Sequence, residues 1–167
     1  PMHCDAVTVE DGRMPATPRR IGSQASAPMK ALGVQYVPVV LVKFADKRFT
    51  AADSTDEGVR DFYQLYCNGT KDGKLYTGHG SYGAVRDYFV QQSDSLLFPE
   101  FVVIGPVTLE GDCATYGRNE GDTHDVGYNA FCEQSIRKAM EIYSDWDRFD
   151  NNGNGDIDMV FFVYAGM

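Results

Sequence analysis

The chain has 167 residues, of which 43% are hydrophobic and 13% aromatic, enough to bury one compact core. Its formal net charge of -9 and its lack of any long lysine or arginine cluster argue against a surface that follows nucleic-acid phosphates. No stretch approaches the roughly 18 consecutive apolar residues of a membrane-spanning helix. We therefore expect one domain, with no nucleic-acid partner and no membrane span.

The amino-terminal region differs in composition from the rest. Residues 1–33 mix Pro, Arg, Ser, Ala and Gly without a sustained hydrophobic period, which is typical of an extended leader or connector. We place a domain boundary near Gly33, so that residues 34–167 form the folded unit. The next segment, YVPVVLVKF at residues 36–44, is a continuous β-branched and aromatic run of strand length. It predicts a central strand buried on both faces.

Three helices are predicted from the spacing of apolar residues. Ser54 and Glu57 have the spacing of a capping box and precede an apolar stripe, so they begin the first helix. The segment GAVRDYFVQQS at residues 83–93 predicts the second helix, and FCEQSIRKAMEIYSDW at residues 131–146 predicts the third. All three are expected to pack on a sheet.

Two further strands alternate with these helices. FVVIGPVTL at residues 101–109 reads as a strand interrupted at Gly105-Pro106, either a bend or an edge segment. MVFFVYAG at residues 159–166 predicts another buried strand. Strands that alternate with helices are typical of an α/β or α+β layered fold.

The four cysteines are too far apart in sequence for a zinc finger or ribbon, whose paired ligands are two to four residues apart. Disulfides in an oxidising compartment and buried free thiols both remain open. The cysteines are Cys4, Cys67, Cys113 and Cys132.

The run DNNGNGDID at residues 150–158 predicts a calcium site. Its first three alternate polar residues can turn their side-chain oxygens onto one hard cation, and Gly155 at the sixth position allows the sharp turn that such a loop needs. A backbone carbonyl at the seventh position and a carboxylate at the ninth complete an oxygen cage. The expected ligands are Asp150, Asn152, Asn154, Asp156 through its carbonyl, and Asp158.

The alternative for this run is an ordinary Asn/Gly turn whose carboxylates face water. Against that reading, three carboxylates within nine residues repel one another unless a cation neutralises them. The twelfth position, where a helix-loop-helix calcium motif has a glutamate, is Phe161. We therefore expect a related loop that leads into a strand and binds calcium structurally, with moderate affinity because two ligands are neutral asparagines.

Several segments together resemble the immune inhibitor A type of secreted zinc metalloprotease. They are VPVVLVKFADKRFT, GAVRDYFVQQSDSLLFPEFVVIGPVTL, CATYG, the amphipathic helix after it, and DRFDNNGNGDIDMVFFVYAG, in collinear order from about Val37 to Met167. The resemblance implies the amino-terminal subdomain of a zincin catalytic domain, a twisted mixed sheet backed by amphipathic helices. It also implies that the acidic loop binds calcium, that residues 1–33 are a propeptide end or connector, and that the protein is secreted or on the cell surface.

The chain departs from that family in one respect. The zinc helix His-Glu-x-x-His, which supplies two ligands and the general base, does not occur in these residues and in the family follows the VYAG strand. We therefore expect a truncated chain that is inactive alone, whose parent enzyme binds zinc and hydrolyses protein or peptide substrates together with the remainder of the catalytic domain. The alternative is a non-catalytic, calcium-stabilised extracellular binding module.

Overall fold

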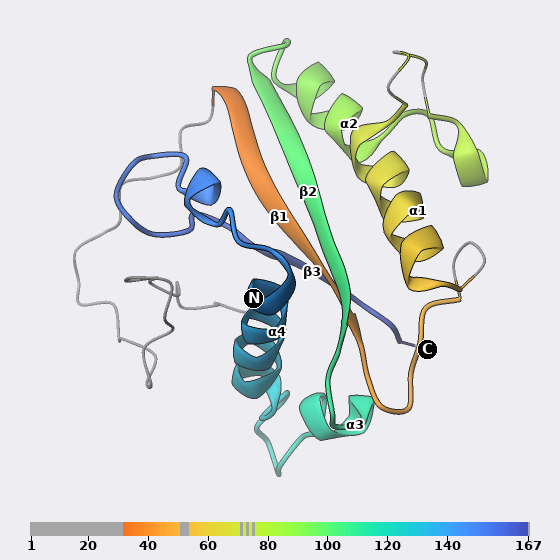
Figure 1. Ribbon diagram of the computed structural model, residues 1–167, viewed down its shortest axis with the longest axis vertical. Coiled ribbons are helices and arrows are strands. Elements are labelled where there is room, and N and C mark those ends of the chain that lie inside the picture. The colour runs from red at the N-terminus through yellow and green to blue at the C-terminus, as the bar shows by residue number, and fades with distance from the viewer. Residues whose placement is uncertain (1–31, 51–53, 71, 73, 75, 167) are drawn as a thin grey trace.

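The computed structural model describes residues 32–50, 54–70, 72, 74 and 76–166, and the predicted leader lies almost wholly outside them. Its centre is a three-stranded sheet in the order β2-β1-β3 (Figure 1). The strands are β1 at Gly33–Lys43, β2 at Leu97–Thr108 and β3 at Phe161–Tyr164. The α/β class and the central position of β1 are confirmed.

Both strand pairs of this sheet are parallel. The expectation of a mixed sheet is therefore wrong for the described strands. The physical reason lies in the connections. Helices occupy the chain between β1 and β2 and again between β2 and β3, and such crossovers return the chain to the end of the sheet at which the previous strand began.

Helices cover both faces of the sheet. One face carries α1 at Asp56–Asn68 and α2 at Val85–Gln92, and the other carries α4 at Tyr128–Ile142 (Figure 1). A short helix α3 at Cys113–Tyr116 and 3-10 turns at Gly78–Gly80 and Asp147–Phe149 complete the structure. The second and third predicted helices are confirmed as α2 and α4.

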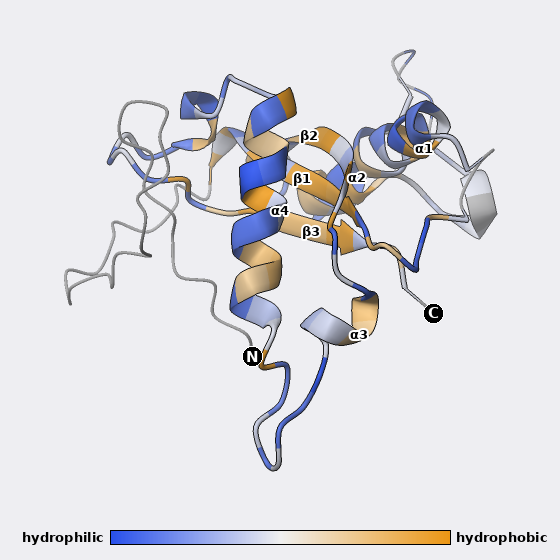
Figure 2. Ribbon diagram, turned by 60° about the horizontal axis from the view of Figure 1, so that its bottom comes forward, coloured by the Kyte–Doolittle hydropathy of each residue, from blue (hydrophilic) through white to orange (hydrophobic). Residues whose placement is uncertain are grey.

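The alternation of side chains along β1 divides the core in two. Val37, Val39 and Leu41 belong to the cluster with α1 and α2, whereas Val40 and Val42 belong to the cluster with α4. In Figure 2 the strands are hydrophobic along most of their length, while α4 has both hydrophobic and hydrophilic residues. A parallel sheet needs this cover on both faces, and the sequence of β1 provides apolar residues at successive positions for it.

The first helix begins one residue later than the capping-box pattern predicts. Thr55, and not Ser54, is the N-cap residue, and its hydroxyl accepts a hydrogen bond from the Gly58 amide at 3.0 Å. Ser54 has a φ of 62° and lies before the helix. The capping assignment to Ser54 and Glu57 is therefore wrong, because a threonine at the next position can accept the same type of bond.

Of the two outer strands, β2 confirms the edge alternative of its prediction, whereas β3 differs from its prediction. β2 runs through Gly105-Pro106 as one edge strand, with a register shift opposite Val40 and Val42. At Gly105 the φ is 107° and a Cβ would lie 2.8 Å from the Leu41 carbonyl, so only glycine fits. β3 is not fully buried as predicted: as an edge strand it leaves Phe161 42% and Tyr164 58% exposed.

The free edge of β2 is covered at one point by a side chain from α1. The Asn68 amide donates to the Phe101 carbonyl at 2.8 Å and its oxygen accepts from the Phe101 amide at 2.9 Å. Asn68 is only 7% exposed, so its side chain is buried against the strand. The asparagine pairs with the strand as a neighbouring strand would.

The thiols give no cross-link in the described core. Cys67 and Cys113 are free, and Cys4 lies outside the described residues. Burial raises the pKa of Cys67 to about 11, as expected for a thiol that packs as a small apolar side chain. None of the described helices is long and apolar enough to cross a lipid bilayer.

Candidate metal-binding loop

The run predicted to bind calcium forms the connection from α4 to β3. It follows the 3-10 turn at Asp147–Phe149, whose last residue is fully buried, and it leads into β3 at Phe161. In Figure 1 it is the blue loop beside the amino-terminal end of β1. One end of the loop is therefore fixed in the core by Phe149, and the other by the sheet.

Asp150 organises the backbone of the loop. One carboxylate oxygen accepts from the amides of Gly153 at 2.7 Å and Asn154 at 3.0 Å, and the other accepts from Gly155 at 2.7 Å. Gly155 has a φ of 88°, which confirms that the sixth position needs glycine. Partial burial acts to raise the pKa of Asp150, but these amide donors outweigh it and lower the pKa below its ordinary value.

The two predicted asparagine ligands fold back over the same loop. The Asn152 side-chain oxygen accepts from the Asn154 amide at 3.0 Å, and the Asn154 side-chain oxygen accepts from the Asp156 amide at 2.8 Å. These successive side-chain turns fix the oxygens instead of leaving them in solvent. Each oxygen keeps a second lone pair for a cation.

Asp158 closes the loop. Its carboxylate accepts from the side-chain amide of Asn152 and, at 2.8 Å, from the backbone amide of Asn151. Its own amide donates to the Phe149 carbonyl at 3.4 Å. Asp158 is thus connected to the start of the loop through Asn151, Asn152 and Phe149.

Asp156 is the residue with an unmet requirement. One of its side-chain oxygens is buried and has no hydrogen-bond partner within the described structure. The sequence predicts a role for its backbone carbonyl, whereas the buried atom is an oxygen of its side chain. A buried, unpartnered carboxylate oxygen is costly unless a cation or a water neutralises it.

Asn151 is a structurally important residue of the loop that the sequence analysis missed. Its side-chain oxygen accepts from the Tyr36 amide at 2.7 Å, and its side-chain nitrogen donates to the Tyr36 carbonyl at 3.0 Å. Tyr36 is six residues before Val42 on the same edge of β1, where Val42 accepts from the Ala165 amide just after β3. Asn151 therefore extends the pairing of that edge ahead of β3. One signal in the sequence was available: the predicted ligands occupy alternate positions, so the side chain of residue 151 points away from those of residues 150 and 152 and is free to contact another part of the chain.

A cation–π contact supports the same corner of the sheet. The Arg148 guanidinium lies 4.2 Å from the centroid of the Tyr36 ring, and it also donates to the Tyr143 hydroxyl at 3.3 Å. Asn151 thus holds the backbone of Tyr36, and Arg148 contacts its ring. The loop and the start of β1 form one structural unit.

The donors present fit a hard cation such as calcium. No three His, Cys, Asp or Glu side chains within the described ranges converge as a metal-binding group. The predicted ligand set is of a different kind, because it includes two asparagine oxygens and one backbone carbonyl. The orphaned oxygen of Asp156 and the fixed oxygens of Asp150, Asn152 and Asn154 are the observations in favour of the fit.

Comparison with known proteins identifies no family. No protein-family model matches the chain, and no curated protein matches it. The resemblance to the immune inhibitor A type of protease therefore depends on the sequence segments alone.

Proposed function

We propose that residues 34–167 are the amino-terminal, calcium-stabilised part of the catalytic domain of a secreted zinc metallopeptidase. The collinear segments described above support the protease assignment, and an α/β sheet covered by helices on both faces is compatible with it. The single observation that supports the calcium assignment best is the loop in which Asp150 organises three amides and Asn151 pairs with Tyr36.

Calcium would be held by oxygens from one short segment. The ligands are those predicted from the sequence: Asp150, Asn152, Asn154, the carbonyl of Asp156, and Asp158. The ion would neutralise carboxylates that otherwise repel one another, and so would stabilise the loop. Because Asn151 connects the loop to Tyr36, this stabilisation would extend to the start of β1.

Zinc would belong to the parent enzyme and not to the described residues. When bound, it supplies the activated water that attacks a peptide carbonyl. The role of the described residues is to provide the sheet against which a peptide substrate is aligned by strand addition. The proposal requires a His-Glu-x-x-His helix after β3 in the parent protein, and a secreted or cell-surface location.

The calcium half of the proposal is tested by thermal unfolding with calcium and with a chelator. At a calcium concentration of about 100 times Kd, a single site adds about 2.7 kcal/mol to the free energy of unfolding. The wild-type chain should show this calcium-dependent rise in Tm, and Asp150→Ala with Asp158→Ala should abolish it. Asp61→Ala with Asp122→Ala removes two exposed carboxylates elsewhere and should retain the rise. An equal rise in both double variants would place the ion at another site.

The protease half is tested on a longer protein. The coding sequence is extended past Met167, and the product is assayed for peptide hydrolysis with and without a zinc chelator. Chelator-sensitive hydrolysis that is lost when the glutamate of a His-Glu-x-x-His helix is changed to glutamine would support the proposal. A parent sequence without that helix would contradict it.

The second candidate is a non-catalytic, calcium-stabilised extracellular binding module. The calcium loop favours it as much as it favours the protease, because the loop needs no zinc ligand. The two candidates give the same melting result and different hydrolysis results. A calcium-dependent Tm in a parent protein without the zinc helix would select the binding module.

A further inference from the structure

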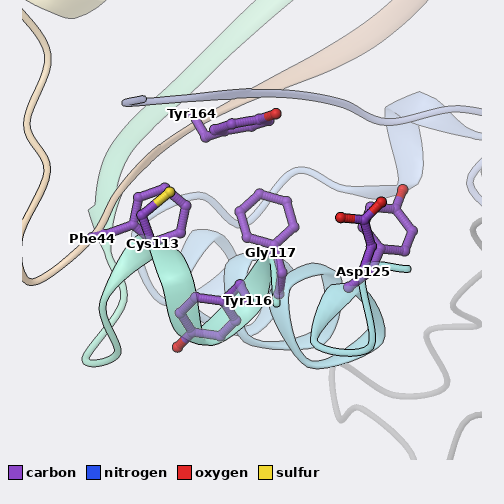
Figure 3. Close-up of a pocket in the computed structure, with 8 residues that line it drawn as sticks. Phe44, Cys113, Tyr116, Gly117, Asp125 and Tyr164 are labelled. Atoms are coloured by element: carbon purple, nitrogen blue, oxygen red, sulfur yellow. The ribbon is translucent and has the colours of Figure 1, made fainter. Parts of the chain in front are cut away.

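A pocket of about 180 Å³ lies at the carboxyl ends of the strands, on the face that α4 covers. Phe44 follows β1, Tyr164 ends β3, and Phe131 comes from the first turn of α4. Figure 3 shows Tyr164 on one side of the space, with Phe44 and Cys113 on a second side and Asp125 across from them. The pocket is at the opposite end of the sheet from the calcium loop, so it is a separate site.

The topology makes this a favourable place for a ligand. From β1 the chain crosses one face to β2, and from β2 it crosses the opposite face to β3 on the other side of β1. The strand order therefore changes direction at β1. In open parallel sheets, ligands bind outside the carboxyl ends of the strands at such a point.

Aromatic rings form most of the pocket wall. The ring centroids of Phe44 and Phe131 are 6.0 Å apart, and Tyr164 lies 6.1 Å from Phe44 and 5.7 Å from Phe131. Tyr116 packs behind them, 5.7 Å from Phe44. Aromatic faces are electron-rich and attract a cation that comes within about 6 Å of the ring centroid.

Asp125 adds a carboxylate to this aromatic wall. Its φ is 52°, an uncommon value for a residue other than glycine, and two hydrogen bonds fix it: its amide donates to the Asn119 side chain at 2.9 Å, and its carbonyl accepts from the Tyr128 amide at 2.9 Å. Within the described part of the chain, no cation pairs with its carboxylate. The pocket therefore has one uncompensated negative charge.

The amino terminus of α4 lies close by and acts in the opposite direction. The aligned peptide dipoles of the helix are equivalent to a positive charge of about one half at this end. A full carboxylate charge on Asp125 is larger than this partial charge. The net charge at the mouth of the pocket is negative, as is that of the whole chain at -9.

We propose that this pocket binds a quaternary ammonium group. A primary ammonium needs acceptors for three N–H donors, whereas the exposed wall is mostly apolar and offers one carboxylate. A quaternary ammonium has no N–H donor, fits a small aromatic space, and is neutralised by the carboxylate. The geometry thus points to a trimethylammonium headgroup, either of a free solute such as choline or of a lipid.

The test compares choline with its uncharged analogue 3,3-dimethylbutan-1-ol by calorimetric titration of the chain. Choline should bind at least about tenfold more tightly than the alcohol. Asp125→Asn should reduce choline binding to that of the alcohol, and asparagine is well tolerated at positive φ. Asp122→Asn, an exposed change in the same loop, should bind choline like the wild type.

Two further measurements complete the test. Tyr164→Leu removes an exposed ring and should weaken choline binding more than binding of the alcohol, which keeps the proposal testable if Asp125→Asn does not fold. Sedimentation with phosphatidylcholine vesicles distinguishes the sources, since a lipid headgroup predicts co-sedimentation that Asp125→Asn loses. Equal affinity for choline and the alcohol, or no binding of choline, would overturn the proposal.

Discussion

Two asparagines make the same pairing with the sheet in two regions of different character. Asn68, the last residue of α1, pairs with both backbone groups of Phe101 on the free edge of β2. Asn151, in the acidic loop, pairs in the same way with Tyr36 on the opposite side of the sheet. Each side chain substitutes for a missing strand.

The difference lies in what holds each asparagine. Asn68 is buried on a helix, so its position depends on packing alone. Asn151 is part of a loop whose neighbours are carboxylates and amides, so its position depends on how well the loop charges are neutralised. One side of this sheet is therefore stabilised by core packing, and the other by the loop for which we propose a calcium site.

The largest effect is expected at the packed edge. Asn68→Ala leaves the buried amide and carbonyl of Phe101 without partners, and should lower the free energy of unfolding by about 3 kcal/mol. The loss should be the same with calcium and with a chelator, measured by urea denaturation. Gln64→Ala, on an exposed position of the same helix, is the control and should change little. A loss confined to one calcium condition would break the comparison.

A smaller and conditional effect is expected at the loop. Asn151→Ala should lower the free energy of unfolding by about 1 kcal/mol, because its contacts with Tyr36 are only partly buried. It should also reduce the calcium-dependent rise in Tm without abolishing it, since Asn151 is not a ligand. Asn129→Ala, at an exposed position at the start of α4, serves as the matched control. An unchanged calcium response in Asn151→Ala would show that loop and sheet are not connected through this residue.

The two regions should also differ in their response to acid. The pKa of Asp150 is lowered in the folded state, so its contribution to stability is present above the ordinary pKa of about 3.9 and is lost as the pH falls through the lower folded value. As the pH falls below about 4, the free energy of unfolding should therefore decrease less steeply in Asp150→Asn than in the wild type. The Asn68→Ala variant should keep the wild-type slope. Identical slopes in wild type and Asp150→Asn would contradict the role given to this carboxylate.

The smallest expected effect is on the rate at which Cys67 is alkylated, and not on the stability of the fold. Burial raises the pKa of Cys67 to about 11, so little thiolate is present near neutral pH and alkylation of the folded chain should be slow. Because Cys67 precedes Asn68, Asn68→Ala should accelerate alkylation, whereas Asn151→Ala should not. Mass spectrometry of the Cys67 peptide after timed exposure to iodoacetamide measures both rates. Rapid labelling in the wild type would contradict the burial of this thiol.

The spacing of hydrophobic residues and the position of a turn glycine predicted much of this structure. The continuous apolar run of β1, the spacing of α2 and α4, and the glycine at position 155 each have a local physical cause and were predicted correctly. The parallel direction of all described strands was missed because it depends on how helices cross the sheet. The exposure of β3 was missed because apolar residues do not reveal which strand is at the edge.

The candidate site was predictable in part. The ligand pattern can be read from alternation along residues 150–158, but Asn151 contacts a residue 115 positions away, and no local spacing encodes that pairing. The position of the Asp125 carboxylate in a pocket could not be predicted from the sequence either, because it depends on how β1, β3 and α4 are placed relative to one another. Long-range contacts of this kind need the fold first.

The central claim is that a cation in the loop stabilises the sheet through Asn151. Amide hydrogen exchange at Tyr36, measured with and without calcium, tests it most directly, because this amide donates to the Asn151 side chain at 2.7 Å. Calcium should slow exchange at Tyr36 in the wild type and should have no such effect in Asn151→Ala or in the Asp150→Ala, Asp158→Ala double variant. Exchange at Tyr36 that does not respond to calcium in the wild-type chain would contradict the account.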